Sequence, residues 1–325
     1  MIVRVTLLTG YAVLATLATI ATGCSCTRKS EVKTMSSASA LGAGDPSLRC
    51  PVALVNARQG GTDPARYVVP TDEERRVLRA SIGRYLREGD SARTTVAGDL
   101  GKIGFEIVDV AELSGTVLLR ERDGEKRGGG AYVLRPASTS RIFVEAPHTF
   151  FDEGTFPLAC ELFRRANAHA LFVETAHRYK SAPPRADGSY PADVAHAEDS
   201  LYQAATQGVL DAMPNAKVVQ LHGFVPRDSF GSVVLSSGDK VEGQRLVLHA
   251  KDRLDPVLGS AAVRRFPEDA SELGATTNVQ GQAVRKAGGE FLHVEIEARL
   301  RRDLLKNPQL RASVIDALAT ALEDA

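Results

Sequence analysis

The stretch that decides the fold runs from Ile142 to Thr155 and reads IFVEAPHTFFDEGT. Its first five residues form a short apolar run of the kind that buried strands show, and Pro147-His148 follows at once. A helix is expected directly afterwards, with Pro157 in its first turn, where proline is well tolerated. This order predicts a strand, a polar loop and a helix, as in one unit of an α/β sheet.

Comparable apolar runs recur later in the chain, and helical patterns lie after or between them. The alternation predicts an α/β fold with a mixed, largely parallel sheet that helices cover on both faces, in a single domain. Further strands are expected at residues 170–174, 218–221 and 291–296, and helices at 156–168, 200–213, 298–305 and 308–322.

The part of the body that precedes this alternation has signals of its own. Thr71-Asp72-Glu73-Glu74 is a capping box, and it predicts a helix from Asp72 to about Glu88. β-rich runs follow at residues 105–108, 116–119 and 132–134, with glycine-containing turn signals between them. We expect these runs to form edge strands of the sheet.

The composition is that of an ordinary globular protein. Hydrophobic residues make up 43% of the 325 residues and charged residues 25%, which excludes wholesale disorder and a multi-span membrane protein. The 40 basic and 40 acidic side chains balance, and no long block of Lys and Arg occurs. Neither a global nor a local positive field is present to attract nucleic acid, so no nucleic-acid partner is expected.

The beginning of the chain has the pattern of a targeting signal. Arg4 precedes an apolar run at residues 5–21 that is too short and too rich in Thr for a membrane span. The run ends in Ala21-Thr22-Gly23 before Cys24, which resembles a bacterial lipoprotein signal whose cysteine is acylated after cleavage. A plain signal peptide or an uncleaved anchor is the alternative.

Three regions follow from this interpretation. Residues 1–23 are the signal peptide, 24–48 a flexible tether of small and polar residues, and 49–325 the α/β hydrolase-like catalytic domain. A lipid on Cys24 would hold the domain at a membrane of the bacterial cell envelope, on its periplasmic face. An oxidising compartment would permit a disulfide between Cys50 and Cys160, although a buried free Cys160 fits its apolar helical surroundings equally well.

Ionisable side chains gather where the predicted strands end. His148 and Arg178 follow the first two strands of the alternation, His222 ends the third, and Glu295 lies within the fourth. Ligands of open α/β sheets bind at the carboxyl ends of strands, so these side chains are candidates for a single site. Two imidazoles and a carboxylate are the ligand set of a catalytic zinc that keeps a fourth position for water.

Each of these residues also has a simpler explanation. A histidine after a strand is often a hydrogen-bonded loop residue. Glu295 lies on the face of its strand opposite Leu292 and Val294, and a carboxylate in a covered sheet needs a partner. On an exposed edge strand, however, it would only be solvated. Arg178 is placed to clamp a substrate carboxylate, or else forms a surface salt bridge.

Three segments of the chain resemble motifs of a known family. The segment from His148 to Thr155 resembles the His-x4-Glu-x-Gly/Thr metal motif of the poly-gamma-glutamate hydrolases, which are relatives of the zinc carboxypeptidases. The segment from His293 to Arg301 looks like the strand that carries their catalytic glutamate, and Leu221-His222-Gly223 falls where the family places its third zinc ligand. N-formylglutamate amidohydrolases are similar through Pro147-His148 and an acidic strand that leads into a Leu-Arg helix.

The resemblance implies a fold, a cofactor and a set of roles. The fold is that of the zinc carboxypeptidases and phosphorylase/hydrolase-like enzymes, with Zn²⁺ held by His148, Glu153 and His222. Glu295 takes a proton from the metal-activated water and passes it to the leaving nitrogen, and Arg178 binds the substrate. The substrate is a small peptide or N-acyl amino acid with an amide bond next to an acidic group.

Departures from the family pattern leave some of this open. Asp152 precedes Glu153, so either carboxylate is a candidate ligand. Thr149, Phe150 and Phe151 occupy the usual glycine-rich turn and are expected to make the pocket floor bulkier. The alternative function is a non-catalytic periplasmic lipoprotein that binds a peptide or cell-wall fragment on the same fold. A serine hydrolase is disfavoured because the chain has no Gly-x-Ser-x-Gly elbow.

Overall fold

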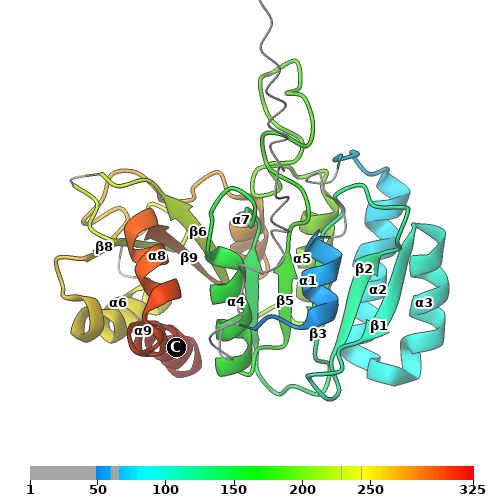
Figure 1. Ribbon diagram of the computed structural model, residues 1–325, viewed down its shortest axis with the longest axis horizontal. Helices are drawn as coiled ribbons and strands as arrows, with labels where there is room; N and C mark the ends of the chain where they lie inside the picture. Colours follow the sequence, from blue (N-terminus) through cyan, green and yellow to red (C-terminus); the bar gives the residue numbers. More distant parts are fainter. Residues whose placement is uncertain (1–48, 60–65, 228, 243) are drawn as a thin grey trace, which may run out of the picture. The chain divides into compact units, whose positions relative to one another are not determined.

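The computed structural model describes residues 49–325 except 60–65, 228 and 243 (Figure 1). The signal peptide, the lipid on Cys24 and the tether all lie outside the described residues, so they stay predictions. Within the described residues, no helix combines the length and the apolar character needed to cross a membrane.

In the described part of the chain, nine strands form one mixed sheet in the order β1-β2-β3-β5-β4-β6-β9-β7-β8. The centre, from β5 through β4 and β6 to β9, is parallel, whereas β1, β2 and β3 form an antiparallel edge. The strands are β1 (Phe105–Asp109), β2 (Val117–Glu121), β3 (Ala131–Leu134), β4 (Ile142–Ala146), β5 (Ala170–Val173), β6 (Lys217–Phe224), β7 (Val233–Ser236), β8 (Val263–Arg265) and β9 (Glu290–Glu297).

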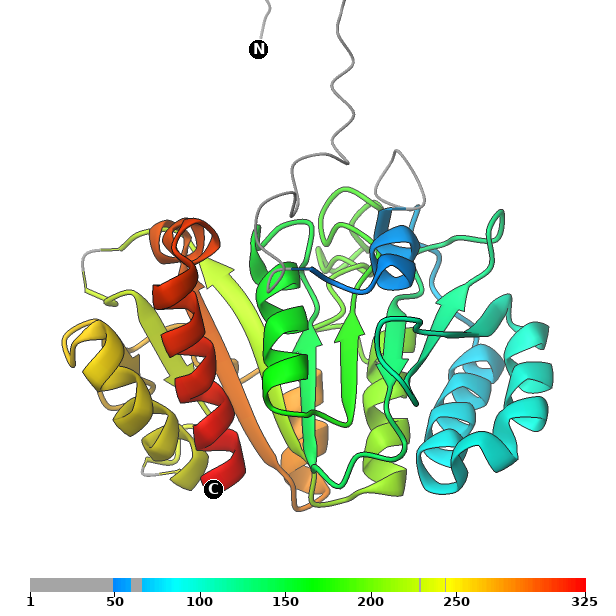
Figure 2. The same ribbon diagram turned by 60° about the horizontal axis from the view of Figure 1, so that its bottom comes forward.

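Helices cover both faces of the sheet (Figure 2). One core packs α1 (Val52–Gln59), α4 (Thr155–Arg165), α6 (Arg245–Leu258), α8 (Ala298–Lys306) and α9 (Pro308–Asp324) against the sheet. The opposite core contains α2 (Asp72–Glu88), α3 (Arg93–Lys102), α5 (Leu201–Ala212) and α7 (Val279–Lys286). Strand residues alternate between the two cores: Val144 and Leu292 belong to the first, and Phe143 and Phe291 to the second. The predicted mixed α/β fold is confirmed.

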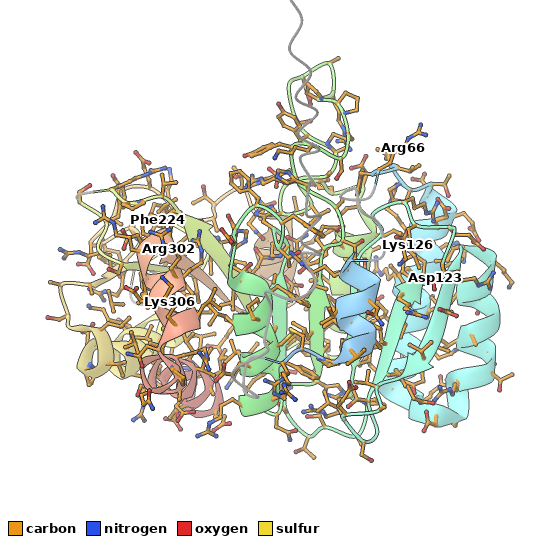
Figure 3. All side chains as sticks on the ribbon, in the orientation of Figure 1. Arg66, Asp123, Lys126, Phe224, Arg302 and Lys306 are labelled. Carbon is orange, nitrogen blue, oxygen red and sulfur yellow. A yellow bond between two sulfur atoms is a disulfide. The ribbon has the colours of Figure 1, made fainter. Side chains whose placement is uncertain are left out.

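Amphipathic helices explain how each layer attaches. The capping box of α2 forms as predicted, with Thr71 accepting from the Glu74 amide and Glu74 accepting from the Thr71 amide. On α8, Leu300 and Leu304 are buried against the first core, while Arg302 and Lys306 are exposed (Figure 3). Apolar residues at this spacing place one helix face on the sheet and leave the charged face in water.

A disulfide joins Cys50 to Cys160, whose Cα atoms are 5.4 Å apart. It connects the segment before α1 to α4, the helix that follows the His148 loop. Of the two alternatives for Cys160, the structure therefore contains the disulfide and not the buried free cysteine. Because it closes a loop of more than a hundred residues, it restricts the unfolded chain and stabilises the fold by about 2–4 kcal/mol.

Candidate metal centre

The carboxyl ends of the central parallel strands lie side by side, and this arrangement builds the site. In the pairing of β6 with β9, His222 is directly opposite Glu295. β4 is the other neighbour of β6, and His148 follows β4 after a single intervening residue. Residues that are far apart in the sequence therefore meet at one edge of the sheet, as expected for a parallel arrangement.

Three buried side chains come together as candidate metal ligands: His148, Asp152 and His222. The Nδ1 atoms of both imidazoles are 3.5 Å from Oδ2 of Asp152. Burial alone would raise the pKa of Asp152, but the interactions with the two neighbouring histidines hold it well below its usual value. The carboxylate is therefore ionised at neutral pH. Two nitrogen donors and one carboxylate oxygen match the ligand set of a three-ligand zinc site.

The carboxylate in this group is Asp152, and the expectation of Glu153 is corrected. The backbone from His148 to Asp152 forms one helical turn, with the Asp152 amide donating to the His148 carbonyl at 2.7 Å. Residues four apart share one side of such a turn, so Asp152 faces His148. Glu153 is one position further round and its side chain is exposed. Its carbonyl oxygen accepts from Nε of Arg301 at 2.7 Å instead.

Each candidate histidine has a hydrogen-bond partner on its other nitrogen. Nε2 of His148 is 2.8 Å from Oδ1 of Asp193, and Nε2 of His222 is 2.7 Å from Oε1 of Gln220. In the neutral form of each ring, an acceptor at Nε2 places the proton there and leaves Nδ1, which faces Asp152, unprotonated. Partners of this kind orient the imidazoles of metal sites and select the tautomer that binds the metal. Neither Asp193 nor Gln220 was predicted from the sequence as part of the site.

Arg178 lies at the same site, but its guanidinium already contacts other residues of the site. Its Nη2 donates to Oδ2 of Asp193, and its Nη1 is 3.2 Å from Nδ1 of His148. The guanidinium also lies over the ring of Tyr179, 4.6 Å from the ring centre. The alternative of a salt bridge is present, with Asp193 as the partner, but the pair is only slightly exposed and does not lie on the open surface. Substrate binding by Arg178 stays a prediction.

A cavity of about 270 Å³ opens beside the candidate ligands. Its wall includes residues 273–278 and the side chains of His148, Arg178, His196, His222, His293 and Glu295. Burial, followed by the nearby charge of Asp152, raises the pKa of Glu295 to about 8. Among the described residues, Oε2 of Glu295 and Nδ1 of His293 have no hydrogen-bond partner. A buried carboxyl group with an unpartnered oxygen therefore lines the cavity beside the ligands.

Arg301 contacts three parts of the site: the His148 loop, the end of β9 and Gly223 on β6. Arg301 on α8 is buried and donates to the carbonyl oxygens of Glu153 and Ile296. Its guanidinium passes so close to Gly223 that a Cβ atom there would overlap it. Glycine after His222 therefore allows Arg301 to connect the His148 loop with the end of β9. This contact gives a physical reason for the His-Gly and Leu-Arg patterns in the sequence.

A second arginine holds the His148 loop from the opposite side. Arg58 on α1 donates through Nη2 to the Thr149 carbonyl at 2.8 Å and through Nε to the Thr149 hydroxyl at 3.1 Å. Its guanidinium covers the ring of Phe150 at 4.0 Å, whereas Phe151 is 48% exposed. Neither phenylalanine is among the residues that line the cavity, so the expected bulky pocket floor is wrong.

Comparison with known proteins gives weak similarities of overall structure. No family model matches the sequence, and no curated protein matches it. A bacteriophage poly-gamma-glutamate hydrolase is 12% identical with a TM-score of 0.40, covering 57% of this chain and 84% of its own. The N-formylglutamate amidohydrolase of Ralstonia eutropha is 11% identical, with a TM-score of 0.37 and coverages of 61% and 98%. A metallo-carboxypeptidase from Burkholderia cenocepacia is 12% identical, with a TM-score of 0.37 and coverages of 72% and 69%.

Proposed function

We propose that this protein is a zinc-dependent amide hydrolase that cleaves an amide bond next to an acidic group. The observation that carries the proposal is the convergence of two imidazole Nδ1 atoms and the Asp152 carboxylate beside a cavity that also contains Glu295. These donors fit zinc in number and chemical type. When bound, zinc would polarise the scissile carbonyl and make a water molecule acidic enough to lose a proton near neutral pH.

Glu295 is the residue that moves the proton in this proposal. Glu295 lines the cavity, its Oε2 atom has no hydrogen-bond partner among the described residues, and its pKa of about 8 shows how strongly burial disfavours its charge. A cation held by His148, Asp152 and His222 would favour the carboxylate form. Glu295 would then accept a proton from the attacking water and return it to the leaving nitrogen.

The rest of the cavity supports an acidic substrate. Arg178 and His196 lie in its wall, and both contact Asp193, which fixes the direction in which they point. A guanidinium and an imidazole in the wall favour a ligand that carries a carboxylate. Small peptides and N-acyl amino acids with an acidic group next to the scissile bond are the substrate class that we infer.

The test uses the full chain loaded with zinc. We expect about one zinc per chain, as in a three-ligand catalytic site, and turnover of glutamate-rich peptides or N-acyl glutamates. At equal zinc occupancy, Glu295→Gln should keep the metal and the fold but lose turnover by ~10²–10⁴-fold, because the variant cannot accept a proton. Glu153→Gln, which changes an exposed neighbour of the ligands, is the control and should retain activity.

Two results would contradict the proposal. Full activity of Glu295→Gln would exclude Glu295 as the base and transfer attention to Glu297 or His293. Zinc-loaded wild-type protein that binds an acidic amide reversibly without cleaving it would instead identify a binding protein.

A further inference from the structure

Gln220 lies on β6 two residues before His222, so both side chains are on the same face of the strand. It is completely buried and makes hydrogen bonds at both ends of its amide group. Its Oε1 accepts from Nε2 of His222 at 2.7 Å and from Nδ2 of Asn278 at 2.6 Å. Its Nε2 donates to Glu145 at 2.8 Å and lies 3.3 Å from Oε1 of Gln280.

Two backbone groups determine which way this amide points. Asn278 caps α7, and its Oδ1 accepts from the Gly281 amide at 2.8 Å, so its Nδ2 must face Gln220. Gln280 donates through Nε2 to the Val194 carbonyl at 2.9 Å, so its Oε1 must face Gln220. Backbone amides only donate and carbonyls only accept. A flipped Gln220 would therefore oppose donor to donor at Asn278 and acceptor to acceptor at Gln280.

The fixed amide acts on the next side chain in the network. Because Oε1 of Gln220 can only accept, Nε2 of His222 must carry a proton, and Nδ1 of the neutral ring is left unprotonated. Nδ1 is the atom that faces Asp152. We propose that Gln220 is a positioning residue whose buried amide holds His222 in the tautomer that leaves Nδ1 free for a metal ion. The part that concerns metal rests on the proposed function, whereas the tautomer does not.

The variants separate this role from simple packing. Gln220→Met keeps an unbranched side chain of similar length but removes both hydrogen-bonding ends. Gln220→Glu keeps an acceptor for His222 and Asn278, and a proton shared with Glu145 can replace the lost amide hydrogen. The matched control is Gln203→Met, which removes another buried glutamine, on α5, whose Nε2 lies 3.3 Å from the Val279 carbonyl.

Imidazole ¹⁵N NMR of the metal-free protein reads the tautomer directly, and competition with a chelator measures zinc affinity. We expect His222 to be protonated at Nε2 in the wild type and in Gln220→Glu, and to lose this preference in Gln220→Met. Zinc affinity should fall by about 10–100-fold in Gln220→Met, the usual effect of losing an outer partner of a metal ligand. It should not fall in Gln220→Glu, which keeps the acceptor for His222, and it should stay near the wild-type value in Gln203→Met.

Several results would overturn the proposal. A wild-type His222 protonated at Nδ1 in the metal-free protein would do so even if Gln220→Met fails to fold. So would unchanged zinc affinity in Gln220→Met, or a loss in Gln203→Met as large as that in Gln220→Met. None of these measurements needs amide hydrolysis, so failure here is distinct from failure of the proposed function.

Discussion

The two histidines of the candidate metal centre present the same nitrogen to Asp152 but are supported in different ways. Behind His148 is the carboxylate of Asp193, which also pairs with Arg178 at the cavity wall. Behind His222 is the neutral amide of Gln220, inside a buried network of other amides. The partner of His148 is therefore charged and lies close to solvent. The partner of His222 is an uncharged amide and is fully enclosed.

The difference is visible in the basicity of the two rings. Burial lowers the pKa of both, but on His148 the hydrogen bonds to Asp152 and Asp193 outweigh burial, so its pKa is raised. On His222 burial prevails, and the pKa falls to about 4. A carboxylate partner therefore strengthens a ligand and also its affinity for protons, whereas an amide partner fixes the tautomer without that effect.

Removing Asp152 breaks both sides at once and is expected to have the largest effect. Asp152→Asn keeps the shape of the side chain but replaces the charged oxygen that lies 3.5 Å from both imidazoles. Loss of an outer partner of a metal ligand lowers affinity by at most about 100-fold. Zinc affinity should fall further in Asp152→Asn, because a direct ligand is lost. Chelator competition on the full chain measures the change.

The neighbouring residue provides the control for this prediction. Glu153→Gln alters an exposed carboxylate one position away and should leave zinc affinity unchanged. If Glu153→Gln releases zinc while Asp152→Asn retains it, the assignment of the carboxylate ligand given above is wrong.

The buried amide network behind His222 ends at an ionisable group, Glu145, which accepts from Gln220. Substituting Glu145 should change how the stability of the fold depends on pH. Burial raises the pKa of Glu145 to about 7, against the effect of hydrogen bonds from Thr206 and Gln220. A carboxyl group with a raised pKa adds its stability below the unfolded pKa and loses it as pH rises through the folded pKa. The fold should therefore lose up to roughly 3 kcal/mol between about pH 4.5 and pH 8 from this group.

Glu145→Gln imitates the protonated acid and should remove this dependence. Its oxygen can accept from Gln220, and its amide can donate to the Thr206 hydroxyl, which has the Tyr202 carbonyl 3.2 Å away as its own acceptor. Urea unfolding of the metal-free protein should show the variant close to wild type at pH 5 and more stable at pH 8. A constant difference between the two proteins at all pH values would contradict the prediction.

Periodicity in the sequence predicted the elements that build the site, and local contacts explain the remainder. The 142–146 strand was predicted with its exact bounds, and the predicted 291–296 strand differs from β9 only at its ends. Strand patterns identified His148, His222 and Glu295 because each lies at or near the end of a buried run. No helix was expected at α1, α3, α6 or α7 and no strand at β7 or β8, and apart from α6 these elements have at most ten residues each.

The partners of the ligands escaped prediction for a different reason. Asp193 lies in the loop between β5 and α5, where no period exists, and it reaches His148 only through the fold. Gln220 looks like an ordinary polar residue in a strand, and its role depends on Asn278 and Gln280 of a distant segment. The choice between Asp152 and Glu153 depended on one helical turn in a loop that composition does not predict.

Giving both histidines an amide partner tests the comparison between Asp193 and Gln220 most directly. The expected effect is the smallest of those predicted. Asp193→Asn places an amide behind His148, as Gln220 does behind His222. Its oxygen can still accept from Nε2 of His148, but the negative charge that Arg178 faces is lost. At pH 8, zinc affinity should fall by about 10–100-fold because the ring becomes a weaker donor and is held less firmly.

The pH dependence of that loss has a predictable sign. In the wild type, the raised pKa of His148 means that protons compete with zinc for Nδ1 as the pH falls. Without the charge of Asp193 this pKa is lower, so the variant suffers less competition. The difference in zinc affinity between wild type and Asp193→Asn should therefore shrink from pH 8 to pH 6 in chelator titrations. A difference that stays constant or widens would show that Asp193 acts on His148 through geometry alone, and the contrast with Gln220 would then lose its electrostatic part.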